Sequence, residues 1–216
     1  MEKKATDKQI IYLKHILNES GLQLTDLTET HYDQLTHTDI CYLLKKCNVP
    51  VSVDIRNLRY VIKQETDDYI IGEQYNVKTR EKMMDVFAFK RLLVLDYDVK
   101  QNSSLTKDEL LRTLIDKLIT QPYSFSIYET YGGYHVYCTS EEFGYNDHST
   151  HSYMKSLGCD RFYIGFTKYV GFAVRLNKKS NRDEIFIERF VTKINPELID
   201  PKLQRLVELK DTFTLE

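Results

Sequence analysis

The sequence predicts an α+β protein, and three stretches in the middle of the chain carry this prediction. The aliphatic run in Leu92–Asp98 indicates a buried strand. Apolar residues then recur at helical spacing after Thr106–Glu109, which has the pattern of a helix capping box. Tyr123–Tyr128 and Tyr134–Cys138 read as strands on either side of a Gly-Gly turn and together indicate a hairpin.

Composition is that of a soluble globular protein. The 216 residues suffice for one domain of ordinary size and a small appendage. Thirty basic and 32 acidic residues give a net charge of -2, which excludes a uniformly basic nucleic-acid coat but not a local basic patch. Neither a signal peptide nor an apolar run of transmembrane length is present. We therefore expect a soluble, intracellular protein with no membrane partner.

The cysteines show no CxxC pairing, and we expect reduced thiols. The four are Cys41, Cys47, Cys138 and Cys159. A zinc site built from Cys159, His148 and His151 is conceivable but lacks the usual ligand spacing.

Two helices are expected at the start of the chain. The first begins at the capping-box pattern Thr6–Gln9 and stops near Gly21, and the second covers Thr38–Cys47. They define a small helical N-terminal segment, residues 1–65, ahead of a main domain, residues 66–216.

The flanks of the central region are less regular. Apolar residues between Ile55 and Ile62 suit a helix, whereas Tyr69–Ile71 and Val86–Phe89 suit strands. Downstream we expect, in order, a short helix over Ser152–Leu157, strands over Gly171–Lys178 and Glu184–Phe190, and a closing amphipathic helix over Pro196–Lys210 with Asp200-Pro201 as a second candidate start.

The two carboxylates that end the central strand are the first candidates for chemistry. Asp96 and Asp98 are two positions apart, so their side chains point to the same face of the strand. Together they form a plausible seat for a divalent cation and the phosphates that it carries. A core strand that runs out into a polar loop can also end in Asp, so the pair alone leaves a structural role open.

Two further features suit an anionic partner. His135 follows Gly133 on the return strand of the hairpin, where glycines let a ligand or another backbone approach closely. A surface histidine is the alternative. Between Arg161 and Lys193 the chain carries eight basic residues and three acidic ones. A charged strand edge that discourages aggregation would have the same composition.

The order of these pieces resembles the archaeo-eukaryotic primase superfamily, the primase-polymerases of archaea, eukaryotes, plasmids and large DNA viruses. The resemblance covers roughly residues 86–192. The motifs stand in the family's order: Asp96-x-Asp98, Gly133-x-His135, Asp160 in a hydrophobic segment, and a strand with Arg175 followed by Lys178. It implies a primase-type catalytic core, which is an RRM-like antiparallel or mixed sheet with flanking helices, preceded here by the helical segment.

The resemblance also implies an activity, DNA-directed nucleotidyl transfer in DNA replication with a two-metal site for Mg²⁺ or Mn²⁺. Asp96, Asp98 and Asp160 would be the catalytic residues and metal ligands. His135, Arg175 and Lys178 would bind the incoming nucleotide, where positive charge also stabilises the leaving pyrophosphate.

The partners that the resemblance implies are a single-stranded DNA template, nucleoside triphosphates and a replicative helicase. If the source is a virus or mobile element, the site of action would be the host cytoplasm or nucleus. Aromatic residues near the motifs belong either to the core or to a base-stacking surface; they are Tyr134, Tyr137 and Phe172.

Several alternatives stay open. Asp147 and Asp183 are other candidates for the third carboxylate. Without a third ligand, the chain would be a non-catalytic relative that binds single-stranded DNA or serves replication initiation. A phosphatase of the haloacid-dehalogenase type also begins with a strand ending in Asp-x-Asp, but we do not find the later Gly-Asp-x-x-x-Asp-like pair. A glycosyltransferase with a metal-binding Asp-x-Asp is usually a larger chain.

Overall fold

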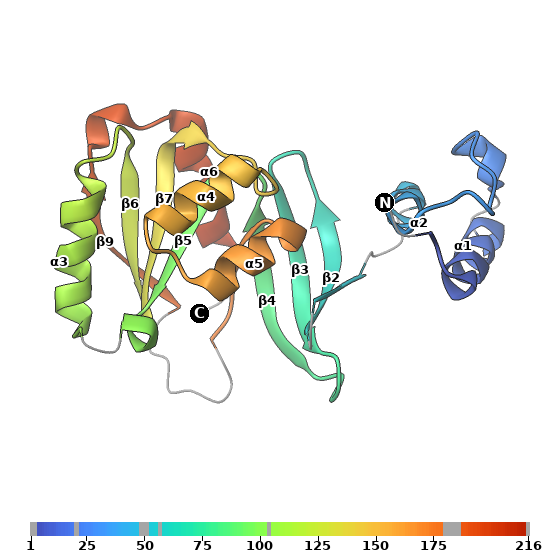
Figure 1. Cartoon of the computed structure of the whole chain (residues 1–216), viewed down its shortest axis with the longest axis horizontal. Helices are drawn as coiled ribbons and strands as arrows, with labels where there is room; N and C mark the ends of the chain where they lie inside the picture. Colours follow the sequence, from blue (N-terminus) through green and yellow to red (C-terminus); the bar gives the residue numbers. More distant parts are fainter. Residues whose placement is uncertain are drawn as a thin grey trace. The chain divides into compact units, whose positions relative to one another are not determined.

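The chain folds into two compact units, Met1–Ser52 and Val53–Glu216. The computed structural model describes residues 4–19, 22–47, 52–55, 58–102, 105–178 and 187–214. Its described elements include six α-helices and two antiparallel sheets (Figure 1). The predicted α+β class is therefore confirmed.

The first unit is helical, as expected. It contains α1 (Asp7–Glu19), a 3-10 turn (Leu24–Asp26) and α2 (His37–Lys46). The predicted capping box starts α1, since the backbone N–H of Thr6 donates to Gln9 Oε1 at 2.9 Å and the backbone N–H of Gln9 donates to Thr6 Oγ1 at 3.4 Å. Its core consists of buried aliphatic side chains: Leu13, Leu17, Leu24, Leu35, Ile40, Leu43 and Leu44.

A five-stranded sheet begins at Ser52, the last residue of the first unit, and otherwise belongs to the second unit. Its order is β1-β2-β3-β4-β8. The strands are β1 (Ser52–Ile55), β2 (Leu58–Glu65), β3 (Tyr69–Asn76), β4 (Lys82–Phe89) and β8 (Phe172–Arg175).

The helix predicted between Ile55 and Ile62 is wrong, because Leu58–Glu65 is strand β2. Its short apolar run fits the periodicity of a helix as well as that of a strand. Antiparallel pairing with β3 makes it a strand. Because this strand belongs to the sheet, the boundary between the units lies at Ser52/Val53 and not at residues 65/66 as predicted from the sequence.

A four-stranded sheet follows, in the order β5-β7-β6-β9. Its strands are β5 (Leu92–Asp98), β6 (Phe125–Thr130), β7 (Gly133–Glu142) and β9 (Glu188–Ile194). The predicted hairpin is confirmed as the antiparallel pair β6–β7. Part of the predicted last strand, residues 184–186, lies outside the described residues.

Four helices accompany this sheet: α3 (Lys107–Leu118), α4 (His148–Ser156), α5 (Arg161–Val170) and α6 (Pro201–Thr212). The predicted capping box starts α3. The hydrophobic segment after Asp160 is helix α5, which ends at Gly171 with a φ of 85°. The second candidate start, Asp200-Pro201, begins α6 after a 3-10 turn over Pro196–Leu198.

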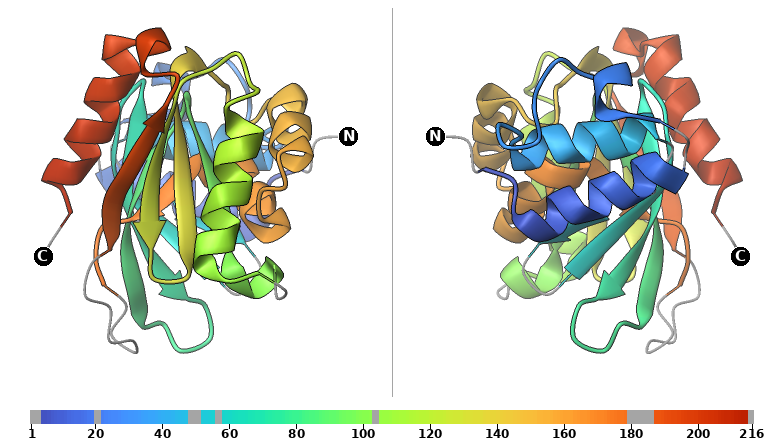
Figure 2. Two further views of the ribbon diagram at one scale, coloured as in Figure 1. Left: turned by 90° about the vertical axis from the view of Figure 1, so that its left-hand side faces the viewer. Right: turned by 90° about the vertical axis from the view of Figure 1, so that its right-hand side faces the viewer.

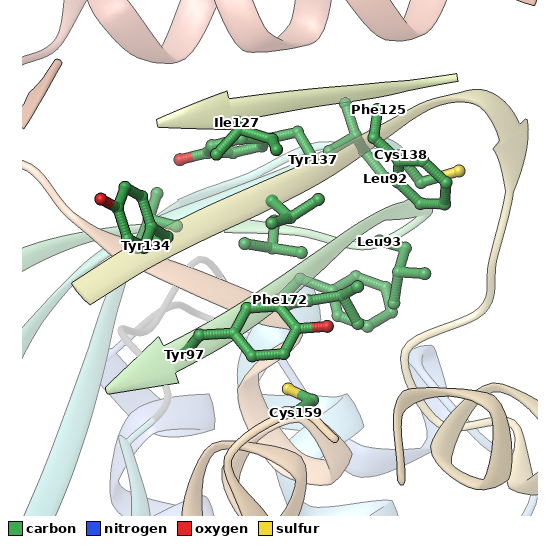
Figure 3. Packing of buried hydrophobic residues seen from close by; sticks show 14 of the residues in the cluster. Leu92, Leu93, Tyr97, Phe125, Ile127, Tyr134, Tyr137, Cys138, Cys159 and Phe172 are labelled. Carbon is green, nitrogen blue, oxygen red and sulfur yellow. The ribbon is translucent and has the colours of Figure 1, made fainter. Parts of the chain in front are cut away.

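The two faces of the four-stranded sheet have different cover. Helices α3 and α6 lie on opposite sides of it (Figure 2). On the α6 side, Phe89 of the other sheet packs edge-on against Tyr137, with ring centroids 6.0 Å apart. Buried side chains of β5, β6 and β7 share one cluster with Cys159 and Phe172 (Figure 3).

The aromatic residues near the motifs belong to this core. Tyr134, Tyr137 and Phe172 are 3%, 0% and 0% exposed. None of them is therefore open to stack on a base. Within the described ranges, no helix is long and apolar enough to cross a membrane. All four cysteines are described, and all are thiols rather than disulfides.

Candidate active site

One open pocket in the second unit brings three of the predicted site residues together. Asp96 of β5, His135 of β7 and Arg175 of β8 all line it. It encloses about 780 Å³ of empty space, part of which is open solvent. The remaining wall comes from the five-stranded sheet, from α5 and from the residue that joins α5 to β8: Tyr60, Gln74, Met84, Val86, Tyr163, Phe166, Gly171, Ala173 and Val174.

The register of β5 and β7 explains why the first two motifs meet. Asp96 lies opposite His135, and Asp98 lies opposite Gly133. Directly opposite residues of an antiparallel pair share a face, so the carboxylates and the imidazole project on the same side. His135 Nε2 is 3.5 Å from Asp96 Oδ1.

Gly133 makes this register possible. A Cβ atom at this position would lie 1.8 Å from the carbonyl oxygen of Tyr97. Only glycine leaves room for such a close approach of β5. The glycine of the Gly-x-His motif is therefore required for the packing of β7 against β5, whether or not a ligand binds here.

Asp98 and Asp160 stand beside this cluster. Asp98 Oδ1 accepts a hydrogen bond from the backbone N–H of Lys100 at 2.9 Å. The backbone N–H of Asp160 donates to the carbonyl of Asp96 at 2.9 Å, so the third motif reaches the same strand end.

The Asp160 side chain caps helix α5. Its Oδ1 accepts from the backbone N–H groups of Phe162 at 2.5 Å and Tyr163 at 3.1 Å. Among the described residues, no three His, Cys, Asp or Glu side chains are grouped so as to hold a metal ion. Of the other candidate carboxylates, Asp147 precedes α4 as its N-cap and Asp183 lies outside the described residues.

The remaining predicted residues are not part of the pocket lining. Lys178 is exposed three residues beyond the end of β8. Residues 179–186 of the basic segment lie outside the described residues. For the conceivable zinc site, His151 Nε2 bonds the carbonyl of Tyr145 at 2.7 Å. Cys159 Sγ accepts from the backbone N–H of Asp96 at 3.3 Å.

A buried ion pair behind His135 was not predicted. Glu188 Oε1 accepts from His135 Nδ1 and from the hydroxyl of Tyr137, the latter at 2.7 Å. Lys210 Nζ donates to Glu188 Oε2 at 2.5 Å and pairs with Asp211 Oδ1 at 2.5 Å. The side chains of Glu188 and Lys210 are only 5% and 2% exposed.

These contacts decide the charge states. Burial alone would raise the pKa of Glu188, but attraction to Lys210 and His135 outweighs it and holds this pKa well below its ordinary value. Burial would lower the pKa of His135, but Glu188 and Asp96 raise it to about 9. At neutral pH the group is therefore an imidazolium between two carboxylates.

Sequence patterns carried little signal for this pair. Glu188 counts as one acid in a basic segment, and Lys210 is a lysine near the end of a helix, where most lysines are exposed. Alternation along the last strand would have been the only guide to the inward direction of Glu188.

Tyr163 contributes an unusual polar atom to the pocket wall. Its hydroxyl is buried, and it has no hydrogen-bond partner in the described part of the chain. An unsatisfied buried hydroxyl is costly, so such atoms commonly mark a place for water or a ligand.

Comparison with models of known protein families, with curated proteins and with solved structures finds no match to this chain.

Proposed function

We propose that this chain is a primase-type nucleotidyltransferase that extends nucleic acid on a single-stranded DNA template. The observation that supports it best is the shared pocket of Asp96, His135 and Arg175. These residues come from three separate motifs and from three different strands. Motif order alone would not require them to meet.

The pocket combines the two kinds of charge that this chemistry needs. Asp96 in the pocket and Asp98 beside it offer carboxylate oxygens, the ligands that Mg²⁺ and Mn²⁺ prefer. Arg175 and the His135 imidazolium offer donors for the phosphates of a nucleoside triphosphate. A pocket with both kinds of charge suits a nucleotide that binds together with its metal ion.

The donor set fits a divalent ion held jointly by protein and substrate. Mg²⁺ sites commonly use one or two carboxylates and complete their shell with substrate phosphates and water. In this proposal Asp96 and Asp98 hold the ion, and Asp160 supports the site as a third carboxylate. When bound, the metal ions neutralise phosphate charge and polarise the attacking hydroxyl.

The protein residues then have distinct roles. Arg175 fixes the phosphates from the side of β8, and His135 does so from β7. We also propose that the four-stranded sheet is the RRM-like sheet of a primase-type core, in which β5 and β7 carry the motifs. Lys178 would contact the template or nucleotide from outside the pocket.

Template-directed synthesis tests the proposal. Purified protein is given a single-stranded template, nucleoside triphosphates and Mn²⁺ or Mg²⁺, with and without a primer. Product is expected from the wild type and not from Asp96→Ala or Asp98→Ala. Asp116→Ala, which removes an exposed carboxylate on α3, serves as the matched control and should keep activity.

A non-catalytic module that binds single-stranded DNA, or serves replication initiation, is the second candidate. The capping role of the Asp160 carboxylate favours it, because that oxygen is already engaged with the backbone of α5. Retained binding of single-stranded DNA, with no product under any metal or primer condition, would select this candidate.

A further inference from the structure

The pair of Glu188 and Lys210 joins β9 to α6 behind the candidate site. Glu188 lies on β9 and Lys210 on α6, and neither lines the pocket. With side chains 5% and 2% exposed, neither can touch a substrate from solvent. Any role in the chemistry must therefore act through another residue.

That residue is His135. Its Nδ1 is bonded to Glu188 Oε1, and its Nε2 lies on the other side of the ring, 3.5 Å from Asp96 Oδ1 in the pocket. A bond to one ring nitrogen fixes the direction of the other. Glu188 thus sets which nitrogen of His135 faces the pocket and where it points.

Lys210 in turn holds Glu188. Its Nζ is 2.5 Å from Glu188 Oε2 and lies over the rings of Tyr128 and Tyr137, 5.2 and 5.4 Å from their centroids. Tyr137 also donates its hydroxyl to Glu188 at 2.7 Å. Three donors from β7 and α6 therefore converge on one carboxylate and leave it a single orientation.

We propose that Glu188 and Lys210 are a positioning pair that aims His135 Nε2 into the pocket and makes helix α6 a necessary part of the site. The ligand that His135 then contacts, the phosphates of a nucleoside triphosphate, rests on the proposed function. The orientation of the imidazole is independent of the proposed function.

Two double variants separate positioning from simple packing. Glu188→Leu/Lys210→Met and Glu188→Gln/Lys210→Met both remove the buried charges together. Apolar replacement of a whole buried ion pair is often tolerated, whereas loss of one partner leaves an uncompensated charge. The single variant Glu188→Leu should therefore lower the thermal midpoint by about 10 °C, and both double variants should recover most of that loss.

The two double variants differ in whether residue 188 keeps a hydrogen-bond acceptor for His135. Glutamine keeps an oxygen that accepts from His135 Nδ1, and leucine has none. Histidine-labelled protein is observed by NMR at one fixed pH, with His135→Asn to assign the signal. We expect a hydrogen-bonded Nδ1–H signal in the wild type and in the glutamine double variant, and its loss in the leucine double variant.

Template-directed synthesis is measured on the same proteins. The leucine double variant should lose about tenfold or more of the wild-type rate despite its recovered stability, and the glutamine double variant should retain more. Lys202→Met is the control, since it removes an ion pair between α6 and Glu142 that does not touch Glu188. It should leave both the signal and the rate unchanged.

The outcomes distinguish the two proposals. If the leucine double variant keeps the Nδ1–H signal, or regains full synthesis with its stability, the positioning role is overturned. If the wild type makes no product but the signal follows the pattern above, the positioning role stands and the proposed activity fails.

Discussion

At Gly133 the hairpin backbone leaves no room for a side chain, and this position offers the sharpest test of the register. An added Cβ would lie 1.8 Å from the Tyr97 carbonyl oxygen, whereas at Gly132 the nearest atom would be Asp98 Oδ1 at 3.6 Å. Gly133→Ala should lower the free energy of unfolding by about 3 kcal/mol, and Gly132→Ala by under about 1 kcal/mol. Urea unfolding followed by circular dichroism measures both, and equal losses would contradict the register of β5 and β7.

Asp160 can be tested separately as a cap and as a carboxylate. Asparagine caps helices about as well as aspartate but carries no charge. Asp160→Asn should keep the stability of the wild type while abolishing metal-dependent synthesis. Asp160→Ala should in addition lose about 1 kcal/mol of stability. An Asp160→Asn protein with full activity would remove Asp160 from the metal site and leave it a capping residue.

Removing the Tyr163 hydroxyl should not destabilise the protein, unlike the loss of most buried polar groups. Because this buried atom has no partner in the described part of the chain, Tyr163→Phe removes a polar group that makes no hydrogen bond. The free energy of unfolding should stay the same or rise by about 1 kcal/mol. Tyr153→Phe is the comparison, since the Tyr153 hydroxyl donates to Gln121 at 3.2 Å, and its loss should be destabilising. A destabilised Tyr163→Phe would show that the hydroxyl is satisfied.

Only residues that belong to a recognisable motif could be singled out from the sequence. Asp96 and His135 could be chosen from sequence because Asp-x-Asp and Gly-x-His are recognisable patterns. Glu188 and Lys210 could not be chosen, because their importance lies in a contact between β9 and α6 that no spacing encodes. Burial of a paired charge is a tertiary property.

At the scale of elements, the strand β3 carries a charge cluster with a defined pH signature. Glu73 contacts Lys63 at 2.9 Å, Lys82 at 3.0 Å and the Tyr75 hydroxyl at 2.7 Å. Hydrogen bonds from Lys63 and Tyr75, with Lys82, lower the pKa of Glu73 from 4.5 to about 2. Its stabilising contribution is therefore fully present above pH 4.5 and is lost as the pH falls toward 2.

This contribution should be about 1 kcal/mol, because the two lysines are half-exposed and the pairs are screened by solvent. Urea unfolding of the wild type and of Glu73→Gln is compared at pH 5 and pH 2.5. The stability difference between the proteins should shrink as the pH falls. Two parallel pH profiles would contradict the assigned cluster.

Elements with a strong local signal were predicted, and those decided by pairing were not. The capping box and long apolar repeat of α3 identify a helix without tertiary information. Leu58–Glu65 has no such signal, and its place beside β3 makes it a strand. The helix α6 was expected, but the sequence offered two possible starts for it. In the structure Asp200 is the N-cap.

At the scale of the whole molecule, the proposed function requires that distant motifs form one nucleotide site. The order of the motifs was readable from the sequence. Their convergence was not, because it depends on the antiparallel register of β5 with β7 and on β8 joining the other sheet. Asp96, His135 and Arg175 meet only through these pairings, whereas Lys178 lies beyond the strand that carries Arg175.

Calorimetric titration with a nucleoside triphosphate in the presence of Mn²⁺ tests whether these residues form a nucleotide site. The wild type should bind with saturation, and Arg175→Ala should weaken the affinity by about tenfold to a hundredfold, the value of a charge-assisted hydrogen bond. Arg112→Ala, which removes an exposed arginine on α3, should bind like the wild type. Absence of saturable binding to the wild type, or equal binding by Arg175→Ala, would show that these residues do not form a nucleotide site.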